Sequence, residues 1–148
     1  MARPLSKQRP RAGTARPRTS GEEERRAALT IRVDFGEHGA LGPGKVRLME
    51  LISQHGSIAS AGKAMGMSYR RAWLLVDAIN QAFREPLIAK QTGGSGGGGA
   101  RLTRLGREVV GRYRAIEGAA ATATAADLRA LRAALASKPP EPGPEDDA

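Results

Sequence analysis

Apolar residues recur every three or four positions through the middle of the chain, a spacing typical of helices with one buried face. The first such segment begins at Pro43, where the missing N–H of proline costs nothing, and ends at His55, just before Gly56. Its apolar positions are Val46, Leu48, Met49, Leu51 and Ile52. The pattern predicts a helix over 43–55 that packs across the back of the two helices that follow.

The stretch from Gly56 to Phe83 predicts two helices joined by a tight turn. Ser57 and Ser68 are each placed to cap a helix by accepting a hydrogen bond from its first backbone amides. Gly66 supplies the left-handed backbone that ends the first of the two helices. The exposed first turn of the second helix carries Tyr69, Arg70 and Arg71. A short helix, a glycine turn and a second helix with a cationic start are typical of a helix-turn-helix, in which that start meets base edges in the major groove of DNA.

Two further regions carry extended patterns. Apolar and polar residues alternate over Ala28 to Phe35, which predicts a half-buried strand followed by a turn over 36–42. Segments 86–91 and 100–103 enclose a glycine-rich loop over 92–99 and predict a β-hairpin. Because the loop carries no bulky side chain, its backbone can lie close to a sugar-phosphate strand. We interpret this hairpin as the wing of a winged helix.

A long final helix is predicted after Thr103, which can cap it. Gly111 and Gly118 each weaken such a helix by about 1 kcal/mol. Its apolar side carries Leu105, Val109, Tyr113, Ile116, Ala120 and Ala123, and then, after a Thr/Ala-rich patch, Leu128, Leu131 and Leu135. This helix is longer than a small wing needs, so its outer half is predicted to mediate dimerisation. The predicted fold class is mainly α with a small β-hairpin wing: a winged helix-turn-helix with a long C-terminal helix.

Composition and pattern together divide the chain into four regions. Residues 1–26 are rich in Arg, Pro, Ser, Thr and Gly and are predicted to form a disordered basic arm, either a DNA-sliding element or an unselected tail. Residues 27–117 form the predicted winged helix-turn-helix DNA-binding domain. Residues 118–136 form the C-terminal part of the dimerisation helix, and residues 137–148 a disordered acidic tail.

The charge is distributed unevenly. The formal net charge is +9, and residues 57–107 hold eight cations against two acids, a local balance of +6. A basic centre behind a basic arm indicates a polyanionic partner, either nucleic acid or an anionic membrane. No apolar run approaches 18 residues and the arginine-rich start lacks a signal-peptide core, so no membrane insertion is expected. The absence of cysteine fits a reducing cytoplasm, and a nucleoid-associated protein is expected.

Signals for catalysis or cofactor binding are weak. Gly94, Gly96 and Gly99 match the spacing of a dinucleotide fingerprint, but the strand–helix–strand context that such a fingerprint requires is missing. The only histidines, His38 and His55, lack further ligands at metal-site spacing. No serine shows a base and orienting group in a catalytic pattern. The sequence therefore predicts a non-enzyme with no cofactor and no metal.

The predicted DNA contacts fall into three groups. Arg70 and Arg71 are predicted to read bases or clamp phosphates, and Tyr69 to touch a phosphate or a thymine methyl. The backbone phosphates are assigned to Lys63, Arg84, Lys90, Arg101 and Arg104. The polar residues Ser57, Ser68 and Ser95 complete the set. Trp73, the only tryptophan, is expected to pack against the first helix of the pair or the wing.

Two motifs carry a family resemblance. GSIASAGKAMGMSYRRAW over 56–73 and REPLIAKQTGGSGGGGARLTRLG over 84–106 resemble the N-terminal DNA-binding domain of the ModE family of molybdate-dependent transcriptional regulators, a LysR-like winged helix. The likeness runs from about Leu29 to Ile116. It implies a homodimer on a palindromic operator, with residues 68–71 at the recognition-helix start and residues 93–101 in the wing. Full-length members continue into oxyanion-binding domains, whereas this chain has one helix and a tail after Thr103, so the resemblance does not transfer molybdate sensing to it. A separate effector or sensor, or none, stays open.

The sequence thus predicts a sequence-specific, homodimeric transcriptional regulator that binds double-stranded DNA. One alternative is a nonspecific architectural nucleic-acid-binding protein, which the charge and the basic arm favour. Another is a protein-interaction module whose acidic end is the contact. An oxyanion-binding protein is a third, if a dimer builds a site from helix ends and the glycine loop.

Overall fold

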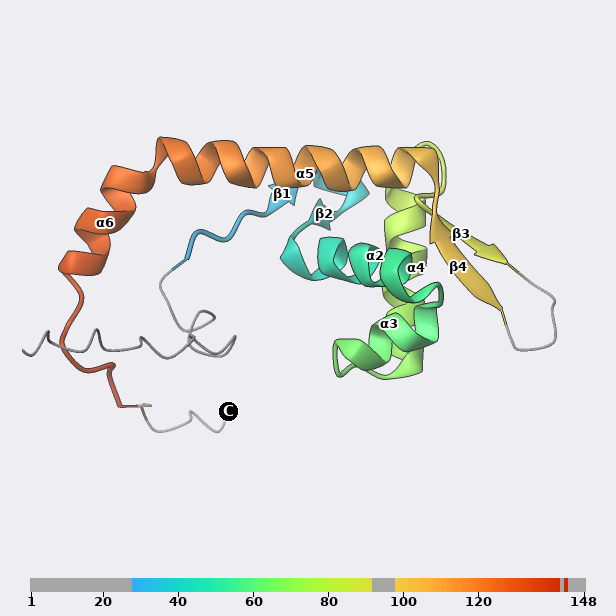
Figure 1. Ribbon diagram of the computed structural model, residues 1–148, viewed down its shortest axis with the longest axis horizontal. Coiled ribbons are helices and arrows are strands. Elements are labelled where there is room, and N and C mark those ends of the chain that lie inside the picture. Colours follow the sequence, from blue (N-terminus) through green and yellow to red (C-terminus); the bar gives the residue numbers. More distant parts are fainter. Residues whose placement is uncertain (1–27, 92–97, 142, 144–148) are drawn as a thin grey trace, which may run out of the picture.

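The computed structural model describes residues 28–91, 98–141 and 143, and its elements form a mainly helical domain with two small hairpins (Figure 1). The elements, in chain order, are β1 (Val33–Asp34), a 3-10 turn (Gly36–His38), β2 (Ala40–Leu41), α2 (Pro43–His55), α3 (Ile58–Ala64), α4 (Tyr69–Ala82), β3 (Ile88–Gln91), β4 (Gly99–Leu102), α5 (Arg104–Ala123) and α6 (Ala125–Ala133). Helix α5 runs along one side of the domain, with α2, α3 and α4 beneath its first part, the β3–β4 hairpin at one end and α6 turning away at the other. This arrangement confirms the predicted winged helix-turn-helix.

The helix-turn-helix is made by α3 and α4, and its boundaries follow the predicted caps. The Ser57 hydroxyl accepts a hydrogen bond from the Ser60 amide at 3.0 Å, and the Ser68 hydroxyl accepts one from the Arg71 amide at 3.2 Å. Gly66 has a φ of 70°, a left-handed value that suits glycine, and it turns the chain between the helices. Local sequence therefore decides where both helices begin and where α3 gives way to the turn.

The main core lies where α2 packs on α3, α4 and the wing strand β4. Its fully buried members come from α2, α4 and the segment after α4, and include Leu48, Met49, Ile52, Val76, Ile79, Leu87 and Ile88. The predicted apolar positions of α2 are all buried. Helix α2 therefore lies behind the helix-turn-helix, as its pattern predicts, and holds it against the wing.

The wing is the antiparallel hairpin of β3 and β4, with Ile88 opposite Leu102 and Gln91 opposite Gly99. The Thr103 hydroxyl caps α5 by accepting from the Gly106 amide at 3.1 Å and donates to the Pro86 carbonyl at 2.7 Å. Helix α5 thus starts directly against the base of the wing. Residues 92–97, most of the predicted glycine loop, lie outside the described residues.

The N-terminal strand differs from its prediction. Of the segment 28–35, only Val33–Asp34 forms a strand, and it pairs with Ala40–Leu41, which was predicted to lie in a turn. The partner strand is two residues long because the chain enters α2 at Pro43. The residues before Val33 therefore have no strand to pair with, although their apolar and polar side chains alternate. Instead, the carbonyl of Ile31 accepts a hydrogen bond from the Tyr113 hydroxyl at 2.7 Å.

The predicted single C-terminal helix is divided at Thr124 into α5 and α6. Gly111 and Gly118, the positions expected to be weak, both lie inside α5. At the break, the Thr124 hydroxyl donates to the carbonyl of Ala120 at 2.7 Å, and the Thr122 hydroxyl donates to that of Gly118 at 3.0 Å. Threonine side chains that bond back to the preceding turn in this way bend or end helices. Among the residues described, no helix is both long and apolar enough to cross a bilayer.

Candidate nucleic-acid interface

The first turn of α4 stands out from the domain. Tyr69 is 61% exposed, and Arg70 and Arg71 are exposed beside it. Directly below them, Ala72 and Val76 are fully buried in the core. The same helix therefore anchors one face in the domain and presents a cationic tip on the other.

A close crossing fixes this tip relative to α3. A Cβ atom added to Gly62 would lie 2.7 Å from the Cβ of Ala72, closer than real side chains come. The small residues of α3 that the sequence offers therefore let the two helices touch almost backbone to backbone. Met65 and Met67 pack against the core at the turn between them.

The wing approaches the same end of the molecule. One pocket of about 210 Å³ is lined by the start of α3, the start of α4 and the wing strands: Ile58, Ala59, Tyr69, Trp73, Lys90, Gln91, Gly98 and Gly99. The Ala100 amide donates to the Gly56 carbonyl at 2.8 Å, which ties β4 to the corner between α2 and α3. The start of α4 and the wing therefore lie side by side, and Arg101 of β4 is exposed.

Lys90, one of the predicted phosphate contacts, is engaged inside the chain. Its ammonium nitrogen lies 3.1 Å from Asp77 Oδ1 and 4.2 Å from the centre of the Trp73 ring. Trp73 also packs against the core, as expected, and meets Tyr69 edge-on at 5.8 Å. The Nε1 atom of Trp73 is buried and has no hydrogen-bond partner in the described part of the chain, so the ring acts through its faces.

Asn80 holds the base of the wing, and the sequence reading missed it. Its side-chain oxygen accepts from the amides of Leu87 and Ile88 at 2.9 and 3.0 Å, and its nitrogen donates to the Ile88 carbonyl at 3.0 Å. These bonds give hydrogen-bond partners to backbone amide and carbonyl groups in the segment that leads from α4 into β3. The available signal was an asparagine within an apolar helical stripe, where it is a poor helix former and suggests a tertiary partner.

The remaining cations divide by position. Six of the predicted DNA-contacting residues are exposed and form no ion pair with another described residue: Lys63, Arg70, Arg71, Arg84, Arg101 and Arg104. Arg84 follows the C-terminal end of α4 and Arg104 opens α5, so both lie at the opposite end of α4 from the tip, about 20 Å along a helix of this length (Figure 1). Lys63 lies on α3, Arg70 and Arg71 on the first turn of α4 and Arg101 on the wing strand β4, whereas Arg84 and Arg104 lie at the far end of α4.

Two cations farther along α5, Arg112 and Arg114, form ion pairs instead. Arg114 bonds to the carboxylates of Glu50 and Glu117, which raises the pKa of its guanidinium and keeps it charged. Burial, followed by the neighbouring Glu117 carboxylate, raises the pKa of the Tyr113 hydroxyl. Both residues fasten α5 to α2 and to the N-terminal segment, and we assign neither to a ligand.

The serines of the predicted set have a local role. Ser57 and Ser68 accept amide hydrogen bonds as caps, which leaves each hydroxyl proton available to an outside acceptor such as a phosphate. Ser95 lies outside the described residues. Its assignment stays a prediction.

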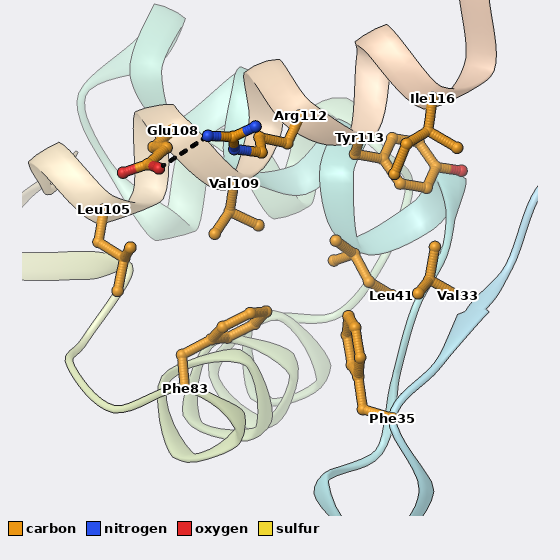
Figure 2. A pocket seen from close by; sticks show the side chains of 10 residues that line it. All are labelled: Val33, Phe35, Leu41, Phe83, Leu105, Glu108, Val109, Arg112, Tyr113 and Ile116. Atoms are coloured by element: carbon orange, nitrogen blue, oxygen red, sulfur yellow. Dashed lines mark ion pairs between the residues drawn. The ribbon is translucent and has the colours of Figure 1, made fainter. Parts of the chain in front are cut away.

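A second, apolar pocket lies on the other side of the domain between β1–β2, the end of α4 and α5. Figure 2 shows the Phe35 and Phe83 rings on one side of this pocket and Leu105, Val109 and Ile116 of α5 on the other. The two phenylalanine rings meet edge-on at 5.7 Å. The lining is mainly apolar, apart from the Glu108–Arg112 ion pair and Tyr113. Among the described residues, no group of three or more His, Asp or Glu side chains able to hold a metal occurs.

Comparisons with known proteins agree with this geometry. No family model matches the chain. The chain is 41% identical over 91 residues to the molybdenum transport protein ModE of Azotobacter vinelandii, which covers 62% of this chain and 33% of that protein. It is 39% identical over 79 residues to the molybdenum-pterin-binding protein MopA of Rhodobacter capsulatus (53% of this chain, 30% of that protein). It is also 39% identical over 71 residues to the DNA-binding transcriptional dual regulator ModE of Escherichia coli K12 (48% and 27%).

The chain spans about a third of the length of these relatives. Over the matched residues, the described winged helix-turn-helix is similar to part of these ModE and MopA proteins, in agreement with the resemblance seen in the sequence.

Proposed function

We propose that this protein is a sequence-specific transcriptional regulator that binds double-stranded DNA as a homodimer. The observation that carries the proposal is the exposed tip of α4, where Tyr69, Arg70 and Arg71 stand clear of the core with their charges unpaired among the described residues. An α-helix fits the major groove, and arginine there can bond to guanine in a bidentate way. The relative in Escherichia coli is named a DNA-binding transcriptional dual regulator.

Each cation then has a role set by its place. Arg70 and Arg71 would contact base edges, because they are exposed on the first turn of α4, the proposed recognition helix. Lys63 on α3 and Arg101 on the wing strand β4 would hold phosphates. Arg84 and Arg104 would reach phosphates only farther along the duplex, because α4 separates them from the tip.

Homodimerisation is the second part of the proposal. Helix α6 has no buried residue, and its Leu131 and the following Leu135 are each 65% exposed. Ile116 of α5 is 47% exposed beside the small residues Gly111, Ala115 and Ala119. A second copy covering these apolar positions would place two recognition helices on one duplex, which matches a palindromic operator. Such a regulator would work in the cytoplasm, on the nucleoid.

The test begins by selecting bound duplexes from a random pool, and then titrates Arg71→Ala against the selected site and against a scrambled duplex. We expect a loss of about 1–3 kcal/mol on the selected site and a much smaller loss on the scrambled one. Arg47→Ala is the matched control, because it removes one exposed positive charge from α2, which lies behind the helix-turn-helix. It should affect both duplexes weakly and equally.

Equal losses on both duplexes for Arg71→Ala would support the nonspecific architectural alternative, which the net charge of +9 favours. Failure to enrich any sequence would reject sequence-specific regulation outright.

A further inference from the structure

Three side chains of α4 form a single stripe that faces the wing. Tyr69, Trp73 and Asp77 are four residues apart, so they stack one turn above the next on one face of the helix. The Tyr69 and Trp73 rings meet edge-on with their planes at 69°. Lys90, from wing strand β3, lies against this stripe and contacts both the Trp73 ring and the Asp77 carboxylate.

The ammonium group of Lys90 is therefore held from two sides by one helix. A carboxylate 3.1 Å away and an aromatic face 4.2 Å away are both favourable neighbours for a cation. The side chain of Lys90 is only 34% exposed as a result. A lysine free to bind a phosphate would instead extend from the strand into solvent.

This contact is the second of two attachments between α4 and β3. The first is Asn80, which binds the backbone of Leu87 and Ile88 at the base of the wing. Lys90 is two residues farther toward the wing tip, or about 7 Å along a strand. On the other strand, the Ala100 amide, opposite Lys90 in the hairpin, is held by the Gly56 carbonyl. At this level of the wing, β4 is therefore anchored to the corner between α2 and α3, and Lys90 anchors β3 to α4.

The position of Asp77 also needs an explanation. Residues 57–107 contain only two acids, and Asp77 is the one on α4, the proposed recognition helix. A carboxylate close to a DNA backbone costs affinity through repulsion by the phosphates. The pairing with Lys90 accounts for it, because it neutralises the carboxylate and gives it a mechanical role.

We propose that Lys90 is a positioning residue, which Asp77 and Trp73 hold so that the wing keeps a fixed angle to the start of α4. In this role it sets the spacing between the contacts of the recognition helix and those of the wing, and it does not itself bind a phosphate. The inference rests on the proposed function and deepens it, because both sets of contacts are to the same duplex.

The sign of one substitution separates the two roles of Lys90. Asp77→Asn removes a negative charge and releases Lys90. If Lys90 were a phosphate ligand, Asp77→Asn would tighten DNA binding. If Lys90 positions the wing, the same change weakens binding, by about three- to tenfold in Kd for a partly exposed contact of this kind.

The second variant is Lys90→Met, which keeps the apolar stem on Trp73 and removes the ammonium. We expect the same loss as for Asp77→Asn, with hydroxyl-radical protection lost at the duplex flanks under the wing and retained at the centre. The salt dependence of Kd should keep its slope. Arg101→Met, the control on the partner strand, should reduce that slope by about one, as expected for a lost phosphate contact.

Measurements on the free protein make the inference independent of DNA binding. Trp73 is the only tryptophan, so its emission reports on the contact directly. Both Asp77→Asn and Lys90→Met should change this emission and speed amide hydrogen exchange in β3, without a comparable change in α2. If the wild type bound no DNA while these changes occurred, the proposed function would fail and the two-point attachment would stand.

Three results would overturn the inference. They are tighter DNA binding by Asp77→Asn, a salt slope reduced by about one in Lys90→Met, and unchanged emission and exchange in both variants. The first two would return Lys90 to the phosphate contacts. The third would show that the contact does not hold the wing.

Discussion

The two halves of the C-terminal helical region differ sharply, although they share one apolar stripe in sequence. The first half of α5 is packed into the domain: Gly106 and Tyr113 are buried, and Arg114 is tied to Glu50 on α2. The second half and α6 bury no large side chain, and Leu131 and Leu135 stand exposed. Figure 1 shows α6 turning away from the rest of the molecule.

This difference in burial indicates a different role for each half. Side chains that are covered within one chain contribute to its folding, whereas an exposed apolar stripe gains nothing until a partner covers it. The inner half therefore belongs to the folded domain. The outer half is the part for which we propose a second copy, and changes to the two halves should act on different measurements.

The largest effect is expected at Gly106. A Cβ atom there would lie 2.2 Å from the carbonyl oxygen of Leu87, and a backbone oxygen cannot move aside as a flexible side chain can. Gly106→Ala should lower the free energy of unfolding by about 3 kcal/mol, measured by chemical denaturation.

Gly118→Ala is the matched control, because no described atom outside its own helix lies within 4 Å of an added Cβ atom. Alanine is the better helix former, so this variant should gain about 0.5–1 kcal/mol. Equal effects of the two substitutions would contradict the contrast between the packed and the exposed half.

The next effect concerns association. Ending the chain at Gly118, or replacing Leu131 and Leu135 together by glutamine, should weaken the dimer by at least about tenfold in Kd, because each buried leucine contributes about 1.5–3 kcal/mol. Chemical denaturation of the dilute monomer should be nearly unchanged. Sedimentation over a concentration series measures the loss, and an identical profile for wild type and variants would reject the proposed interface.

A smaller effect is expected at Tyr113. Tyr113→Phe removes the hydrogen bond to the Ile31 carbonyl and should cost about 1 kcal/mol of stability at neutral pH. Burial raises the pKa of the native tyrosine above its unfolded value, so its contribution is fully present below about pH 10 and is lost as the pH rises beyond that. The two proteins should therefore converge in stability in alkaline solution, and a constant difference would contradict this assignment.

Much of the fold could be predicted because its signals are local. Ser57, Ser68 and Thr103 cap the helices that they precede, and Gly66 makes the turn of the helix-turn-helix. Such features depend on a few neighbouring residues, which a single sequence displays. The buried face of α2 could be predicted for the same reason, since the helical spacing of its apolar residues indicates which side chains are buried.

Only part of the candidate site could be predicted from the sequence. The exposed cationic start of α4 follows from its helical pattern, since apolar residues on one face leave Arg70 and Arg71 on the other. The engagement of Lys90 did not follow, because Asp77 is thirteen residues away and meets it only once the wing folds back on α4. Asn80 was missed for the same reason.

The sequence alone was enough to predict where α2, α3, α4 and α5 begin and that the middle of the chain is cationic. Only the tertiary structure decided that two residues of the N-terminal segment pair as a strand, that the last helix divides at Thr124, and which cations remain exposed and unpaired among the described residues. The physical reason is the distance along the chain over which each interaction acts. Caps and periodicity act within a turn or two of helix, whereas strand partners, side-chain ion pairs and exposure depend on segments that only folding brings together.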